Sequence, residues 1–129
     1  MAYPKVADTY LKVQDMDRAV RFYEALLGVK AKYRYKDRWT SITDRLALYN
    51  PSSDVQNEVP MTDHDRPVRI GNNVVIVFMS DDIDREYERV QALGITGLTD
   101  IVEVNLVAPY RFFQCFDTEG NLIELGHMG

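Results

Sequence analysis

The chain has 129 residues, of which 46% are hydrophobic and 27% are charged, and its formal net charge is −5. This balance is typical of one compact domain or two small modules and excludes a disordered chain. Basic residues alternate with acidic ones, as in Asp84-Arg85-Glu86, so nucleic acid and anionic membranes are not expected as partners. The acidic balance is compatible with a cationic ligand.

No apolar run approaches the roughly 20 residues that span a bilayer, and residues 1–5 lack the charged-then-apolar pattern of a signal peptide. We therefore expect a cytoplasmic protein. The single cysteine, Cys115, excludes a disulfide within the chain, and its apolar neighbours favour a small core residue over a reactive thiol.

The first half of the chain reads as strand, helix and three strands. A half-alternating pattern predicts a strand over 5–13, and Asp15 precedes apolar residues at helical spacing over 16–27. Gly28 is placed to end that helix. Short strands are predicted over 31–36, 39–43 and 46–49, with turns at 37–38 and 44–45.

The second half repeats this order. We predict a strand over 73–79, a helix over 83–93 capped by Ser80 or Asp82, and Gly94 at its end. Strands are predicted over 98–102, 110–116 and 122–125, with a turn at 117–121 before the last.

The two helices also match in sequence, because Asp17-Arg18 corresponds to Asp84-Arg85 and Leu27-Gly28-Val29 to Leu93-Gly94-Ile95. Such a repeat predicts two similar modules, 1–49 and 73–129. Residues 50–72 would be a linker, a lid or an arm toward a second chain. The predicted class is α+β, with curved mixed sheets around a cleft, helices outside and pairing into a homodimer.

Two segments carry a resemblance to a known family. Residues 13–28 resemble the first strand–helix signature of the glyoxalase / bleomycin-resistance / extradiol-dioxygenase superfamily, the vicinal oxygen chelate proteins, and residues 116–125 resemble its closing hairpin. Thr118 and Glu119 replace the usual Pro and Asp of that hairpin. The resemblance implies two βαβββ modules, but the family includes lyases, epimerases, dioxygenases, thiol transferases and drug-binding proteins.

The resemblance also implies where a metal would bind. Metal-dependent relatives place four His, Gln or Glu ligands in the cleft, and those positions fall on Asp8, Ala47, Val75 and Glu124 of this chain. Because Ala47 and Val75 offer no donor, we expect no cofactor. The open alternative is a divalent metal held by Asp8 and Glu124, with further ligands from His64, His127 or a second chain.

Strand alternation assigns residues to the cleft. The predicted ligand-binding cleft is lined by Asp8, Tyr10, Lys12, Trp39, Ala47, Tyr49, Val75, Val77, Met79, Arg111 and Glu124. Asp8 and Glu124 are expected to approach one cavity from opposite modules, with Lys12 or Arg111 as a partner of Glu124. Trp39 is either a stacking platform or part of the packing.

Three functions remain open on the sequence. The first is a metal-free protein of the resistance type that binds a small, possibly cationic organic molecule. The second is an enzyme, a glyoxalase I-like lyase or a dioxygenase with an atypical ligand set, in which Glu124 is catalytic. The third is an interaction module without a small ligand.

Overall fold

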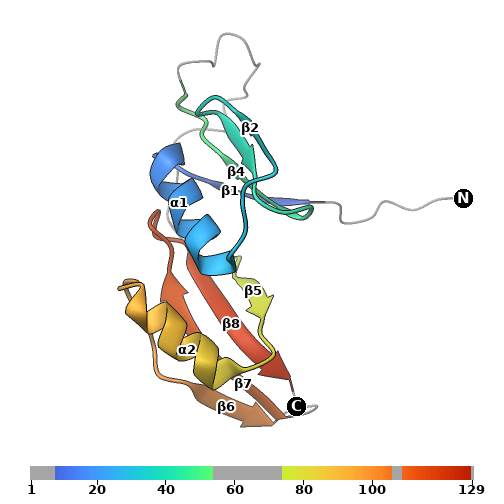
Figure 1. Cartoon of the computed structure of the whole chain (residues 1–129), viewed down its shortest axis with the longest axis vertical. Coiled ribbons are helices and arrows are strands. Elements are labelled where there is room, and N and C mark those ends of the chain that lie inside the picture. Colours follow the sequence, from blue (N-terminus) through green and yellow to red (C-terminus); the bar gives the residue numbers. More distant parts are fainter. Residues whose placement is uncertain (1–7, 54–73, 106–108, 129) are drawn as a thin grey trace, which may run out of the picture. The chain divides into compact units, whose positions relative to one another are not determined.

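A computed structural model describes residues 8–53, 74–105 and 109–128. The strands in these ranges form two separate four-stranded sheets, and the chain divides into two units, Met1–Arg69 and Ile70–Gly129. One helix lies across one face of each sheet (Figure 1). The structure is therefore α+β with two copies of one strand–helix–three-strand motif, as the sequence predicts.

The first unit contains one helix and four short strands. The elements are β1 (Thr9–Lys12), α1 (Met16–Leu27), β2 (Tyr33–Tyr35), β3 (Trp39–Ser41) and β4 (Leu46–Tyr49). The strand order is β1-β4-β3-β2, with β1 parallel to β4 and the other pairs antiparallel. The parallel pair follows from the helix that separates β1 from the rest of the sheet.

Local signals fix the ends of α1 where the sequence predicts them. The Asp15 carboxylate accepts a hydrogen bond from Arg18 N at 3.0 Å, and Gly28 ends the helix at φ +66°. That left-handed backbone favours glycine. The buried face of α1 packs on β3 and β4 and consists of Met16, Ala19, Val20, Tyr23 and Leu26.

The second unit has the same layout with longer final strands. Its elements are β5 (Ile76–Met79), α2 (Ile83–Ala92), β6 (Val102–Asn105), β7 (Pro109–Phe116) and β8 (Leu122–Met128). The order is β5-β8-β7-β6, and again only the β5–β8 pair is parallel. Of the two predicted caps, Asp82 is the N-cap, because its carboxylate accepts from Arg85 N at 3.2 Å.

The predicted strand over 98–102 is wrong, because β6 begins where that prediction ends. The preceding segment runs beside β7 in an irregular way: Thr99 N donates to Gln114 O at 2.9 Å, and Phe116 N donates to Thr96 O at 3.0 Å. Gly97 lies between these contacts at φ +73°, a backbone conformation that a regular ladder does not accept. The apolar residues at 98 and 101 therefore lie outside the strand.

The predicted linker over 50–72 begins as part of the first unit. Asn50 and Ser53 are buried, and Asn50 N donates to Arg38 O at 2.8 Å. Residues 54–72 lie outside the described residues, so their role as linker, lid or arm stays a prediction. Within the described ranges, no helix has both the length and the apolarity that a membrane crossing requires.

Candidate functional site

The predicted cleft residues of the first unit share one face of its sheet. Register partners on neighbouring strands point to the same side, and Tyr10 is paired with Ala47, while Lys12 and Trp39 are both paired with Tyr49. This face is opposite α1, because Tyr10 on it is half-exposed, whereas Leu48 and its partner Thr40 on the other side of β3 and β4, the strands that α1 covers, are fully buried. Asp8 precedes β1, is exposed, and accepts a hydrogen bond from Thr9 N at 3.0 Å.

Three aromatic rings gather on that face. Tyr10 lies 5.5 Å from Trp39 and 5.5 Å from Tyr49 between ring centroids, and Trp39 lies 6.2 Å from Tyr49. Tyr49 is buried and its hydroxyl accepts from Arg38 Nη1 at 3.1 Å, whereas Tyr10 is half-exposed. The cluster is therefore anchored at Tyr49 and open at Tyr10.

In the second unit, Val77 and Met79 lie on the sheet face opposite α2, with Glu124 between them and β7. Val77 is paired with Glu124, which is paired in turn with Gln114, and Met79 is paired with Gly126. Val75 precedes β5 by one residue and is half-buried. Strand alternation thus places these predicted residues as expected, but nothing bound to them tests their role.

The carboxylate of Glu124 is held by two neutral donors. Tyr110 Oη donates to Oε2 at 2.7 Å, and Gln114 Nε2 donates to Oε1 at 2.8 Å. Within residues 8–53, 74–105 and 109–128 there is no cation bonded to this partly buried carboxylate. Its negative charge is therefore oriented but not neutralised by the side chains that are described.

Tyr110 and Gln114 were not predicted as site residues. Burial, together with the hydrogen bond to Glu124, raises the pKa of Tyr110 to about 12, so its phenol remains a donor at neutral pH. The sequence holds a signal for these two residues. Positions 110, 112, 114 and 116 alternate along the strand that neighbours Glu124, so they share one face of the sheet with it.

Arg111 is on the other side of the sheet. Its guanidinium donates to both carboxylate oxygens of Asp84 on α2, at 2.9 and 3.0 Å, and the hydrogen bond from Arg111 lowers the pKa of that carboxyl. The expected pairing of Arg111 with Glu124 is wrong, because the two residues belong to opposite pleats of adjacent strands. Within this unit Arg111 faces the helix and not the predicted cleft surface.

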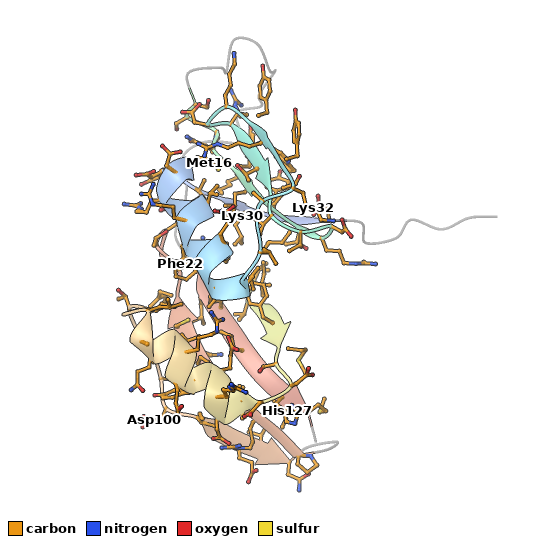
Figure 2. The ribbon with its side chains drawn as sticks, in the orientation of Figure 1. Met16, Phe22, Lys30, Lys32, Asp100 and His127 are labelled. Carbon is orange, nitrogen blue, oxygen red and sulfur yellow. The ribbon has the colours of Figure 1, made fainter. Side chains whose placement is uncertain are left out.

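The described residues do not fit a metal centre. They hold no group of three or more His, Cys, Asp or Glu side chains placed to share an ion. His127 (labelled in Figure 2) is on the opposite pleat from Glu124, and its Nδ1 donates to Ser80 O at 2.8 Å. His64 lies outside the described residues. The side chains of Ala47 and Val75 have no atom that could bind a metal.

The chain matches one family model over residues 5–125, that of the Glyoxalase/Bleomycin resistance protein/Dioxygenase superfamily. No curated protein matches it.

Similar solved structures cover nearly the whole chain. One is a protein of unknown function from Agrobacterium tumefaciens (TM-score 0.74, 18% identity, 98% of this chain and 96% of that one). A second is a glyoxalase/bleomycin resistance protein/dioxygenase from Nocardioides (TM-score 0.73, 19% identity, 99% and 85%). A third is a lactoylglutathione lyase from Agrobacterium tumefaciens (TM-score 0.66, 21% identity, 98% and 96%). At these identities the likeness concerns the fold.

Proposed function

Because the chain belongs to the Glyoxalase/Bleomycin resistance protein/Dioxygenase superfamily, we propose that it binds a small organic molecule with a cationic group, without a metal. Glu124 would receive that group. The observation that carries the proposal is the Glu124 carboxylate, oriented by Tyr110 and Gln114 on the sheet face opposite α2.

The charge of Glu124 supports a cationic ligand. The donors described for the Glu124 carboxylate, Tyr110 and Gln114, are both neutral, and a partly buried charge interacts more strongly with an incoming cation than an exposed one. An ammonium group of a ligand would supply the compensation that the described residues do not.

The surroundings of Glu124 support a ligand with an apolar body. Val77 is 46% exposed and Met79 is 61% exposed, and both lie on the same sheet face as the carboxylate. Sites for small molecules commonly combine an apolar lining with a few polar groups that fix orientation. An amine attached to an apolar or aromatic body matches this combination.

Separately from the Glu124 site, we propose a stacking surface on the first unit. Tyr10 and Trp39 present ring area opposite α1, and the Trp39 indole nitrogen already donates to Ser41 Oγ at 3.0 Å. Aromatic faces stack on planar ligands and attract cations. We propose that Tyr10, Lys12, Trp39, Ala47 and Tyr49 form this surface, with Asp8 at its edge.

The test is binding of benzylammonium, with benzyl alcohol as the neutral probe of the same shape. We expect Glu124→Gln to weaken benzylammonium binding about tenfold to a hundredfold, since hydrogen bonds to charged groups contribute about 1.5–3 kcal/mol and about 1.4 kcal/mol is a factor of ten. Titration calorimetry measures the loss. Glu88→Gln removes the same charge from the exposed side of α2 and is the matched control.

If Glu88→Gln weakened benzylammonium binding as much as Glu124→Gln, the loss would be explained by net charge alone, which would contradict the proposal. Loss of benzyl alcohol binding in Glu124→Gln would also contradict it, because that loss would mean a damaged surface.

A second candidate function is a divalent-metal-dependent lyase or dioxygenase with an atypical ligand set. It is favoured by one observation, that Glu124 lies on the sheet face opposite α2 at the position where the family resemblance implies a ligand. Elemental analysis of the purified protein discriminates the two candidates. About one tightly bound divalent ion per chain would favour the enzyme and direct attention to His64.

We also propose that the protein acts as a homodimer in the cytoplasm. The described sheets have β1, β2, β5 and β6 at their edges, and edge strands of this kind are commonly covered by a partner. Light scattering at micromolar concentration should give twice the mass of 14.9 kDa. A monomer mass under those conditions would contradict the dimer.

A further inference from the structure

Tyr110 reaches Glu124 from a distance along the sheet. Its register partner on β8 is Met128, four residues beyond Glu124, whereas Gln114 is directly opposite Glu124. The ring of Tyr110 therefore extends along β8 toward Glu124, and its hydroxyl approaches Oε2 to 2.7 Å. Because Tyr110 is not directly opposite Glu124, register alone does not bring the two side chains together. The contact depends on the residue that lies between them on β8.

Gly126 is what lies between them. A Cβ at that position would be 2.1 Å from Tyr110 Oη and 2.5 Å from Cε1 and Cζ, well inside van der Waals contact. The backbone of Gly126 is not in the left-handed region, so its conformation is open to other residues. Space for the phenol, and not backbone freedom, is the reason for glycine here.

A third residue fixes the plane of the phenol. Phe112, two residues along β7 on the same face, stacks on Tyr110 with ring centroids 5.4 Å apart and ring planes inclined by 18°. The phenol of Tyr110 is thus held in a single orientation by three neighbours. Phe112 stacks on one side of the ring, the backbone of Gly126 lies beneath it, and the Glu124 carboxylate accepts the hydrogen bond at its end. In turn the phenol holds one oxygen of Glu124, and Gln114 holds the other.

We propose that Tyr110 is a positioning residue that presents the Glu124 carboxylate to a ligand's ammonium group, and that Gly126 allows it to do so. This inference rests on the proposed function. An unrestrained glutamate side chain would lose rotamer freedom when a ligand binds, and a carboxylate already held by two donors avoids most of that loss. Tyr110 thus acts on affinity through Glu124 and needs no contact with the ligand.

Two substitutions remove the same contact by different means. Tyr110→Phe deletes the hydroxyl and keeps the stacked ring, and Gly126→Ala displaces the ring and keeps the hydroxyl. Each should weaken benzylammonium binding about fivefold to tenfold, because ordering a side chain on binding costs about 0.5–1.5 kcal/mol and about 1.4 kcal/mol is a factor of ten. Binding of benzyl alcohol should change less than about twofold, because benzyl alcohol has no positive charge to interact with the Glu124 carboxylate.

The double variant Tyr110→Phe/Gly126→Ala is the sharper test. If both substitutions act through the hydroxyl–carboxylate contact, their effects do not add. The double variant then binds benzylammonium with the same affinity as whichever single variant has the larger loss. Tyr87→Phe is the matched control: it deletes a tyrosine hydroxyl in the same unit, from a ring that packs on Phe113 on the α2 side of the sheet. It should leave both affinities unchanged.

The outcomes separate the two proposals. A loss in Glu124→Gln with unchanged binding in Tyr110→Phe would overturn the positioning role and leave the proposed function standing. Unchanged benzylammonium binding in Glu124→Gln would overturn both. Should Gly126→Ala fail to give a native circular dichroism spectrum, Tyr110→Phe with the two probes still decides. Equal losses for benzylammonium and benzyl alcohol would indicate a structural role and overturn the proposal.

Discussion

Phe113 on β7 meets Tyr87 on α2 edge to face, with ring centroids 5.0 Å apart and planes inclined by 86°. Phe113 is fully buried, so this contact joins α2 to the middle of its sheet. We expect Phe113→Ala to lower the free energy of unfolding by about 3–5 kcal/mol, the usual range for a buried phenylalanine. Chemical denaturation measures this. Phe116→Ala, at a position that is 40% exposed, should have a clearly smaller effect.

Asp117 organises the turn between β7 and β8. Its carboxylate accepts from Glu119 N and Asn121 N, both at 2.8 Å, and from Asn121 Nδ2 at 2.9 Å. Asp117→Ala would leave these donors without their acceptor, and we expect a loss of stability of about 2–3 kcal/mol. The neighbouring Thr118 is exposed, so Thr118→Ala should leave the midpoint of urea unfolding nearly unchanged. A similar loss in both variants would contradict the role of Asp117.

The pKa of Tyr110 predicts a stability change at high pH. Because the folded-state pKa is raised from 10.0 to about 12, mainly by burial and then by Glu124, folding favours the protonated phenol. This contribution to stability is complete below about pH 10 and is lost as the pH rises toward about 12. We expect the wild type to lose stability in this range more steeply than Tyr110→Phe. Parallel unfolding curves across pH 9–12, as a test range, would contradict it.

Cys115 should be an inert thiol in the native state. It is completely buried in β7, and burial, followed by the charge of Asp117, raises its pKa to about 11. Since the thiolate is the reactive form, alkylation by iodoacetamide at neutral pH should be slow in the folded protein and fast in guanidinium. Mass spectrometry of timed samples follows the reaction. Rapid native labelling would show that β7 opens readily.

Much of the fold follows from local signals in the sequence. Asp15 and Gly28 mark the ends of α1, and Asp82 begins α2, because caps are determined by one or two side chains. The predicted strand over 98–102 is misplaced because its apolar residues suggest a regular ladder. Gly97 and the hydrogen bond of Thr99 to β7 make this segment irregular, so that β6 begins only at Val102. Backbone conformation outweighed hydrophobic pattern at that point.

The candidate site was predictable only in part. Alternation placed Tyr10, Val77 and Glu124 on the faces opposite the helices, and the turn at 117–121 brings Gln114 opposite Glu124. Arg111 was misassigned because parity along β7, rather than charge complementarity, decides which side it faces. The reach of Tyr110 across Gly126 depends on a side-chain conformation and on the room beneath it, neither of which alternation encodes.

The two described sheets have no strand in common, and every described strand finds its ladder partners inside its own unit. A break of the chain between β4 and β5 would therefore interrupt no backbone ladder of the described strands. Each described four-stranded sheet is therefore encoded by a single uninterrupted stretch of the chain.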